Sequence, residues 1–206
     1  MSTKGTRDAG PDSFTRRKRR EQLVDCAIDA VVELGFQGTS VGEVAQRAGV
    51  SKGVVTYHFA AKDDLIFAVV ARIFDSVTEA LESQLRGTSP ETFVADYIEA
   101  WVQYYGTQPR YMLAIREIWS NFRDERGDQH FGPQAVEGEL GVVQHVLQYG
   151  QEHGILGTFD VRVMALSIKA ALDALLDQLA ANPELDLAAY GGELVTLFER
   201  ATRPDT

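Results

Sequence analysis

The hydrophobic residues of this chain recur at three- and four-residue intervals along almost its whole length. In the first such segment the stripe runs through Leu23, Ala27, Val31 and Leu34, with Val24 and Ile28 beside it. This spacing is typical of an amphipathic helix that buries one face. No alternation of apolar and polar residues stands out as a strand, so the pattern predicts an all-α fold.

Glycine, proline and small polar residues divide this pattern into separate segments. We expect Gly35 to end the first helix, Gly87-Thr88-Ser89-Pro90 to break the chain after a long one, and a polar loop to cover 123–133. The long helix would measure about 36 Å at ~1.5 Å per residue, enough to join two domains. After a first helix that precedes Gly35, the predicted helices span about 41–47, 52–59, 63–86, 91–106, 109–123, 134–153, 160–181 and 186–201.

Composition places the chain among globular proteins. Hydrophobic residues make up 45% and charged residues 24% of 206 residues, which is ordinary for a soluble domain. No apolar run reaches the roughly 18–20 residues of a membrane span, so we expect no membrane association. The single cysteine, Cys26, excludes an internal disulfide and fits a cytoplasmic location.

Charge is distributed unevenly along the chain. The net charge of −10 argues against binding to nucleic acid. However, residues 1–62 carry ten Lys/Arg and seven Asp/Glu, a net of +3, while residues 63–206 carry ten and twenty-three, a net of −13. This basic head on an acidic body favours an N-terminal DNA-binding domain.

Residues 39–59 have the spacing of a helix-turn-helix. Ser40 followed by Glu43 predicts a capping box that opens one short helix, and Gly49 suits a turn that needs positive φ. Ser51 is placed to cap the second helix, and Ala45 is small where two helices cross. The predicted buried side consists of Val44, Ala48, Val50, Val55 and Phe59.

The second short helix leaves a polar side that suits DNA. A lysine can meet a phosphate, a glycine lets the backbone approach, tyrosine and histidine can donate to phosphate oxygens, and small apolar groups can touch a thymine methyl. The candidate contacts are Lys52, Gly53, Val54, Thr56, Tyr57 and His58. A helical hairpin without DNA is the alternative interpretation.

This segment resembles the TetR/AcrR family of bacterial regulators over residues from about 16 to 70. The resemblance consists of a basic first helix, Thr-Ser-Val at 39–41, Ala-Gly-Val-Ser-Lys-Gly at 48–53, Tyr-His-Phe at 57–59 and Lys-Asp-Asp-Leu at 62–65. It implies DNA contacts from Lys52, Gly53, Thr56, Tyr57 and His58. It also implies phosphate contacts from Lys62, Thr39 and Ser40. Thr56 stands where the family often has an aromatic residue.

A basic run, Arg16-Arg-Lys-Arg-Arg20, lies near the start of the first helix. Cations oppose the helix dipole there, so they do not serve helix stability. We therefore favour a phosphate or minor-groove role for Arg16, Arg17, Lys18 and their neighbours over a merely solvated tail. Residues 1–13, which lack a periodic pattern, are expected to be a mobile tail.

Residues 91–123 are rich in large aromatic side chains. Core packing accounts for most of them, but tyrosine and tryptophan carry polar tips that suit a small-molecule cavity. The resemblance implies an effector pocket in this region. The candidate effector contacts are Trp101, Tyr105, Met112, Trp119 and His145.

The last two predicted helices carry apolar residues on more than one face, including Ile168, Leu172 and Leu197. Because one protein core covers only one face, we expect a second copy of the chain to cover the other, as a four-helix bundle across a two-fold axis. A buried central helix of a monomer is the alternative.

These observations together predict a homodimeric DNA-binding transcriptional regulator that is not an enzyme. The predicted domains are a tail (1–13), a helix-turn-helix domain (14–62) and an effector-binding and dimerisation domain (63–206). The family resemblance implies a repressor that binds a palindromic operator and is released by a small molecule. No metal-ligand spacing or nucleotide loop occurs, so we expect no metal and no cofactor. An architectural DNA-binding protein and an all-α enzyme are the alternatives.

Overall fold

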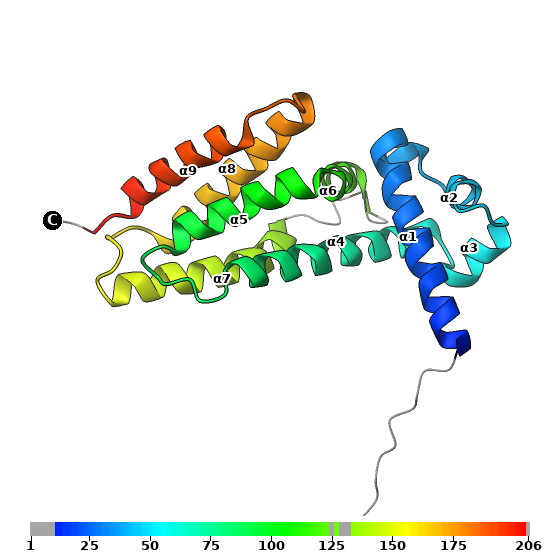
Figure 1. Cartoon of the computed structure of the whole chain (residues 1–206), viewed down its shortest axis with the longest axis horizontal. Coiled ribbons are helices and arrows are strands. Elements are labelled where there is room, and N and C mark those ends of the chain that lie inside the picture. Colours follow the sequence, from blue (N-terminus) through cyan, green and yellow to red (C-terminus); the bar gives the residue numbers. More distant parts are fainter. Residues whose placement is uncertain (1–10, 124–125, 128–132, 205–206) are drawn as a thin grey trace, which may run out of the picture. The chain divides into compact units, whose positions relative to one another are not determined.

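The computed structural model describes residues 11–123, 126–127 and 133–204 (Figure 1). Its elements are helices, which confirms the predicted fold class. They are α1 (Pro11–Gly38), α2 (Val41–Arg47), α3 (Lys52–His58), α4 (Lys62–Gln84), α5 (Phe93–Thr107), α6 (Pro109–Asn121), α7 (Pro133–Glu152), α8 (Val161–Ala181) and α9 (Leu187–Thr202). Most of the predicted tail and most of the predicted loop at 123–133 lie outside the described residues.

The chain forms two compact units that divide between Arg72 and Ile73. This division falls inside α4, so α4 contributes its first half to one unit and its second half to the other. None of the described helices has the length and apolar character of a bilayer span.

The first unit packs α1, α2, α3 and the start of α4 around a common core. Helix α1 is interrupted at Gly35, whose φ of 73° and ψ of 170° are not helical, as the sequence predicted. The sequence pattern placed Leu34 on the buried stripe of this helix, but its side chain is 46% exposed, so that prediction is wrong. Phe36, which follows the break, is 7% exposed instead. The core of this unit includes Leu23, Ala27, Ile28, Val44, Val55, Phe59, Leu65 and Val69.

Helix α1 begins earlier than the sequence predicted. The tail was expected to reach residue 13, but the helix starts at Pro11. Proline suits a first helical position because its φ is already near −65° and its missing N–H would have no intrahelical acceptor there. The basic run at 16–20 therefore lies in the second and third turns of α1 rather than at its start.

The second unit consists of the end of α4 and α5 to α9. Helix α9 packs on α5 and α8, and α7 packs on α8. The approach of α9 to α5 is close, since a Cβ at Gly191 would lie 2.9 Å from Val102 Cγ2. The Tyr104 hydroxyl donates to Ser76 Oγ at 3.0 Å and ties α5 to α4 within this unit.

Candidate functional site

The turn between α2 and α3 is built by local signals. Ser40 Oγ accepts a hydrogen bond from Glu43 N at 3.1 Å and opens α2, and Gly49 turns the chain with a φ of 66°. The backbone then closes through a hydrogen bond from Val50 N to Ala45 O at 3.0 Å. The helix-turn-helix predicted from the sequence is therefore present. Helix α2 has the predicted bounds, and α3 ends one residue earlier than predicted.

Ser51 precedes α3 but its side chain does not cap the helix, which corrects the prediction. A Cβ at Gly53 would lie 3.7 Å from Ser51 Oγ, so the hydroxyl stands beside the first turn without meeting its amide groups. The backbone carbonyl of Ser51 instead accepts from Val54 N at 3.0 Å.

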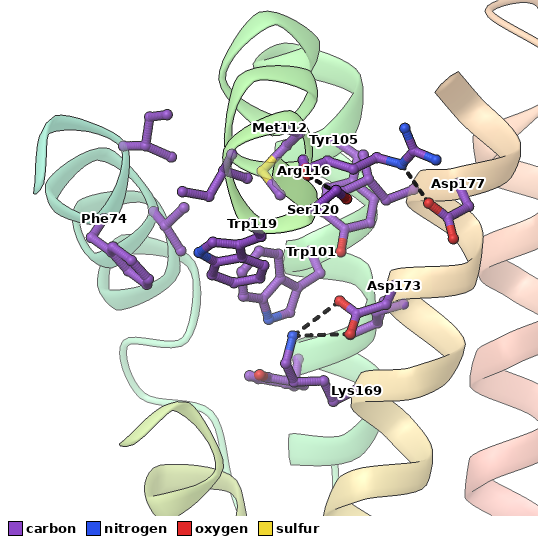
Figure 2. Close-up of a pocket in the computed structure, with 16 residues that line it drawn as sticks. Phe74, Trp101, Tyr105, Met112, Arg116, Trp119, Ser120, Lys169, Asp173 and Asp177 are labelled. Carbon is purple, nitrogen blue, oxygen red and sulfur yellow. Dashed lines mark hydrogen bonds and ion pairs between the residues drawn. The ribbon is translucent and has the colours of Figure 1, made fainter. Parts of the chain in front are cut away.

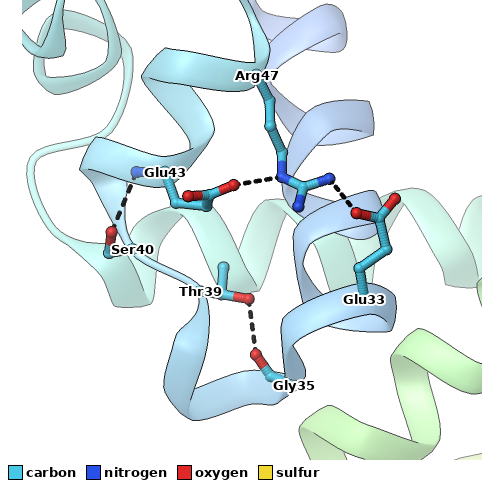
Figure 3. A network of polar contacts seen from close by, with 6 residues as sticks. All are labelled: Glu33, Gly35, Thr39, Ser40, Glu43 and Arg47. Carbon is cyan, nitrogen blue, oxygen red and sulfur yellow. Dashed lines mark hydrogen bonds and ion pairs between the residues drawn. The ribbon is translucent and has the colours of Figure 1, made fainter.

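A polar network holds α2 against α1 (Figure 3). Arg47 Nε donates to Glu43 at 2.7 Å, and a terminal nitrogen of the same guanidinium donates to Glu33 of α1 at 2.8 Å. The hydrogen bond to Glu33 is the main reason that the pKa of Arg47 is raised above its usual value. Because these donors are engaged inside the unit, Arg47 serves the placement of α2.

Helix α3 presents one buried side and one exposed side. Val55 is fully buried and Phe59, directly after the helix, is 2% exposed. Lys52 is exposed and Tyr57 is 70% exposed. A tyrosine that is exposed to this extent leaves most of its ring and its hydroxyl for a partner.

The other predicted contacts of α3 lie on or beside this exposed side. Gly53 and Thr56 are exposed, and the Thr56 hydroxyl donates to Gly53 O at 3.1 Å. Val54 and His58 are half-buried. The exposed side of α3, a helix that the structure describes in full, is therefore polar and uncrowded, and the helix carries no carboxylate of its own.

The basic run of α1 lies next to the end of α3. All side chains from Arg16 to Arg20 are exposed, and the Arg20 guanidinium carbon lies 4.8 Å from the centroid of the Phe59 ring. The pKa of His58 is lowered first by burial and then by the charges of Arg16, Arg20 and Arg19. Two segments more than thirty residues apart in the sequence thus meet at the end of α3.

Two of the expected phosphate contacts turn inward instead. Thr39 is 1% exposed and its hydroxyl donates to Gly35 O at 2.9 Å. Lys62 Nζ donates to Phe36 O at 2.6 Å and lies 4.2 Å from the centroid of the Phe36 ring. Burial also lowers the pKa of Lys62. Both side chains stabilise the broken end of α1, whereas Ser40 stays exposed.

Residues 23–69, which contain this helix-turn-helix, match the family model for bacterial regulatory proteins of the tetR family. The chain thus contains a helix-turn-helix segment similar to that of the tetR family.

Curated relatives of this chain include regulators named BetI. The match to BetI of Klebsiella pneumoniae is 28% identical over 104 residues, which are 50% of this chain and 53% of the relative. The match to BetI of Serratia proteamaculans is 34% identical over 71 residues, 34% of this chain and 36% of the relative. The chain therefore spans about half of the first relative's length and about a third of the second's.

Solved structures share the fold over most of the chain. A TetR-family regulator from Rhodococcus sp. has a TM-score of 0.77 at 19% identity and covers 89% of this chain and 98% of its own. FadR of Bacillus subtilis, solved with stearoyl-CoA, has a TM-score of 0.73 at 19% identity, with 86% and 96% covered. NalD of Pseudomonas aeruginosa has a TM-score of 0.73 at 20% identity, with 93% and 98% covered. The TetR-like fold thus extends from the helix-turn-helix through the second unit.

The second unit contains a cavity of about 160 Å³ between α4, α5, α6 and α8 (Figure 2). Four of the five candidate effector contacts line it, namely Trp101, Tyr105, Met112 and Trp119. The fifth, His145 of α7, lines a separate cavity of about 790 Å³ instead. Trp101 lines both cavities.

The polar wall of the smaller cavity was not predicted. Arg116 of α6 pairs with Asp177 of α8, and Lys169 Nζ pairs with both carboxylate oxygens of Asp173 at 3.0 and 3.1 Å. Phe74 of α4 also lines the cavity and lies 6.3 Å from Trp119 between ring centroids. The Lys169–Asp173 pair was visible as an i, i+4 spacing, but only the fold brings Arg116 to Asp177.

The outer side of α8 and α9 carries several exposed apolar side chains. Ile168, Leu172 and Leu194 are buried in the unit. In contrast, Val163 is 60% exposed, and Leu166 of α8 and Leu197 of α9 are 37% and 57% exposed. Ala165 is 1% exposed and belongs to the core, while Ala170 and Ala174 of the same helix are exposed.

Proposed function

We propose that this protein is a transcriptional repressor that binds a palindromic operator as a homodimer and releases it on binding a small molecule. The observation that carries the proposal is the exposed polar side of α3 beside the basic run of α1. A positive face is required for binding to phosphates, and here it stands on a chain whose net charge is −10.

Helix α3 is the proposed recognition helix, because it presents exposed residues in both of its turns while its opposite side is buried. Lys52 would pair with a phosphate, Tyr57 would donate to a second one, and Gly53 would let the backbone approach the duplex. The arginines at 16–20 would extend the phosphate contacts along the DNA. Thr39 and Lys62 are left out of this set because their polar groups are engaged inside the unit.

The homodimer would use the outer side of α8 and α9. Val163, Leu166 and Leu197 are large apolar side chains that water would otherwise cover, and the exposed alanines between them allow two helices to approach closely. A two-fold axis through this side would pair two copies of α3. Such pairs fit successive major grooves when they stand about 34–36 Å apart.

Binding of the small molecule would release the operator through a movement of α4. Phe74 and Val77 of this helix line the smaller cavity, and the same helix continues into the first unit. A molecule that binds better to one position of α4 shifts the population of that position. The FadR structure contains stearoyl-CoA, and NalD is a repressor of an efflux pump; both relatives of the fold support this type of function.

The direct test measures binding of the purified protein to fragments of its own genome by fluorescence anisotropy at several salt concentrations. We expect a selected fragment to bind with a salt slope that falls by about 0.9 per subunit in Lys52→Ala, since each lost phosphate contact releases fewer counterions. The matched control is Arg86→Ala, which removes an exposed cation of the second unit and should leave the slope unchanged. Equal slopes for Lys52→Ala and the unaltered protein would refute the assignment of α3.

A further inference from the structure

Two tryptophans that line the smaller cavity carry buried N–H groups for which the described residues supply no acceptor. Nε1 of Trp101 and Nε1 of Trp119 are buried and have no hydrogen-bond partner within the part of the chain that the structure describes. The rings come from α5 and α6, and both line the same cavity (Figure 2). A buried N–H without an acceptor is costly, so both groups are suited to acceptors that a bound molecule brings.

The size of the cavity limits what can carry those acceptors. A volume of about 160 Å³ is close to that of engineered cavities of roughly 150 Å³ that bind benzene. Aromatic and aliphatic side chains, including Phe74, Tyr105 and Met112, form most of its wall. A single flat ring with its substituents therefore matches both the volume and the lining.

The charged residues at the cavity disfavour an ionic ligand. Lys169 Nζ lies 5.5 Å from the centroid of the Trp119 ring, where a cationic ligand would otherwise stack. Its side chain is only 16% exposed and is paired with Asp173. Arg116 is likewise paired with Asp177. Because each cation at the cavity is already paired with a carboxylate, neither an added cation nor an added anion would find an unpaired opposite charge among these four side chains.

We infer that the smaller cavity binds a neutral molecule with one flat ring that presents carbonyl-type oxygens to the indole N–H groups of Trp101 and Trp119. This assignment rests on the proposed effector role of the cavity and adds the chemical class of the effector. A carbonyl oxygen accepts without donating, so it satisfies an indole N–H, whereas an ammonium ion or a hydrocarbon does not.

The two tryptophans make the inference testable in the intact protein. The chain has only these two tryptophans, so a sample with ¹⁵N-labelled indoles gives two indole N–H signals, both from the cavity. The probes are acetophenone and α-methylstyrene, which have the same shape and differ in a carbonyl oxygen against a CH₂ group. We expect acetophenone to move at least one indole proton downfield and to bind about 2- to 12-fold more tightly, the range of one net hydrogen bond.

Trp101→Phe and Trp119→Phe keep an aromatic ring and remove the N–H. We expect the responsible variant to lose the preference for acetophenone while its affinity for α-methylstyrene stays within about twofold. A variant that does not fold leaves the test intact, because the probe pair and the two signals of the unaltered protein decide it. Indole signals that do not move with acetophenone, or equal binding of the two probes, would overturn the inference.

Charged probes test the neutral character of the ligand. Benzoate and benzyltrimethylammonium should both bind more weakly than acetophenone, and tighter binding of either one would overturn this part of the inference. These measurements contain no DNA. A protein that binds acetophenone as expected but no genomic fragment would therefore refute the proposed repressor and leave the cavity assignment standing, and the reverse result would refute the cavity assignment alone.

Discussion

Substitution of Gly53 by alanine should raise the stability of the protein and weaken its binding to DNA. Gly53 is an exposed residue in the first turn of α3, where glycine is a weak helix former. A Cβ there would meet only Ser51 Oγ at 3.7 Å, an ordinary contact. Gly53→Ala should therefore raise the free energy of unfolding by about 0.4–1 kcal/mol, chiefly because alanine restricts the unfolded chain.

The same methyl group should weaken DNA binding, because it stands where the backbone of α3 is proposed to approach the duplex. Loss of one close contact worth about 1–1.5 kcal/mol corresponds to about 5- to 12-fold in affinity for each subunit. Thermal unfolding and anisotropy on one operator fragment measure the two effects in the same preparation. The expected rise in Tm is about 2–8 °C for a unit of this size.

Gly141→Ala is the matched control for Gly53→Ala. Gly141 is an exposed glycine of α7 in the second unit, and a Cβ there would meet no atom of the described residues within 4 Å. This variant should show a similar gain in stability and unchanged DNA affinity. If Gly53→Ala binds DNA as tightly as the unaltered protein, the backbone of α3 does not approach the duplex and the proposed docking is wrong.

Three further substitutions test other parts of the account. Lys62→Ala should lower the unfolding free energy by about 1–2 kcal/mol, because a charged donor to Phe36 O is lost. The salt slope of DNA binding should stay unchanged, and a reduced slope would show that Lys62 does contact a phosphate. Burial and the neighbouring arginines lower the pKa of folded His58, so the unfolded chain takes up the proton more readily. Stability should therefore decrease as the pH falls below about 6.5, and denaturant titrations at two pH values should show a smaller decrease in His58→Gln. An equal decrease in both proteins would assign the effect to other groups. Leu197→Asp places a charge on an apolar residue that is 57% exposed and should shift sedimentation toward a single chain of 22.7 kDa; an unchanged dimer would exclude this side of α9 from the interface.

The helix-turn-helix was predictable because its signals are local. Ser40, Gly49 and the apolar positions Val44 and Val55 act within a few residues of one another, so their spacing in the sequence fixes the bounds of α2 and α3. The aromatic cluster of α5 and α6 was predictable for the same reason, since residues three, four or seven apart share a face of a helix.

The inward orientation of the Lys62 and Thr39 side chains depends on tertiary structure. Lys62 reaches the carbonyl of Phe36, which is 26 residues away in the sequence, and Thr39 meets Gly35 only because α1 breaks there. The pair of Arg116 and Asp177 joins residues 61 apart. A periodic pattern shows which side of a helix is apolar, but it does not show which polar group of another helix lies opposite.

The most direct measurement of the central claim is a hydroxyl-radical footprint of the purified protein on a fragment selected from its own genome. Two copies of α3 held by one dimer predict two protected segments, related by a two-fold axis and centred about one helical turn of DNA apart or a multiple of it. Both segments should disappear together in Lys52→Ala at moderate salt. Uniform cleavage of every fragment at low salt, or a single protected segment without symmetry, would contradict the proposal.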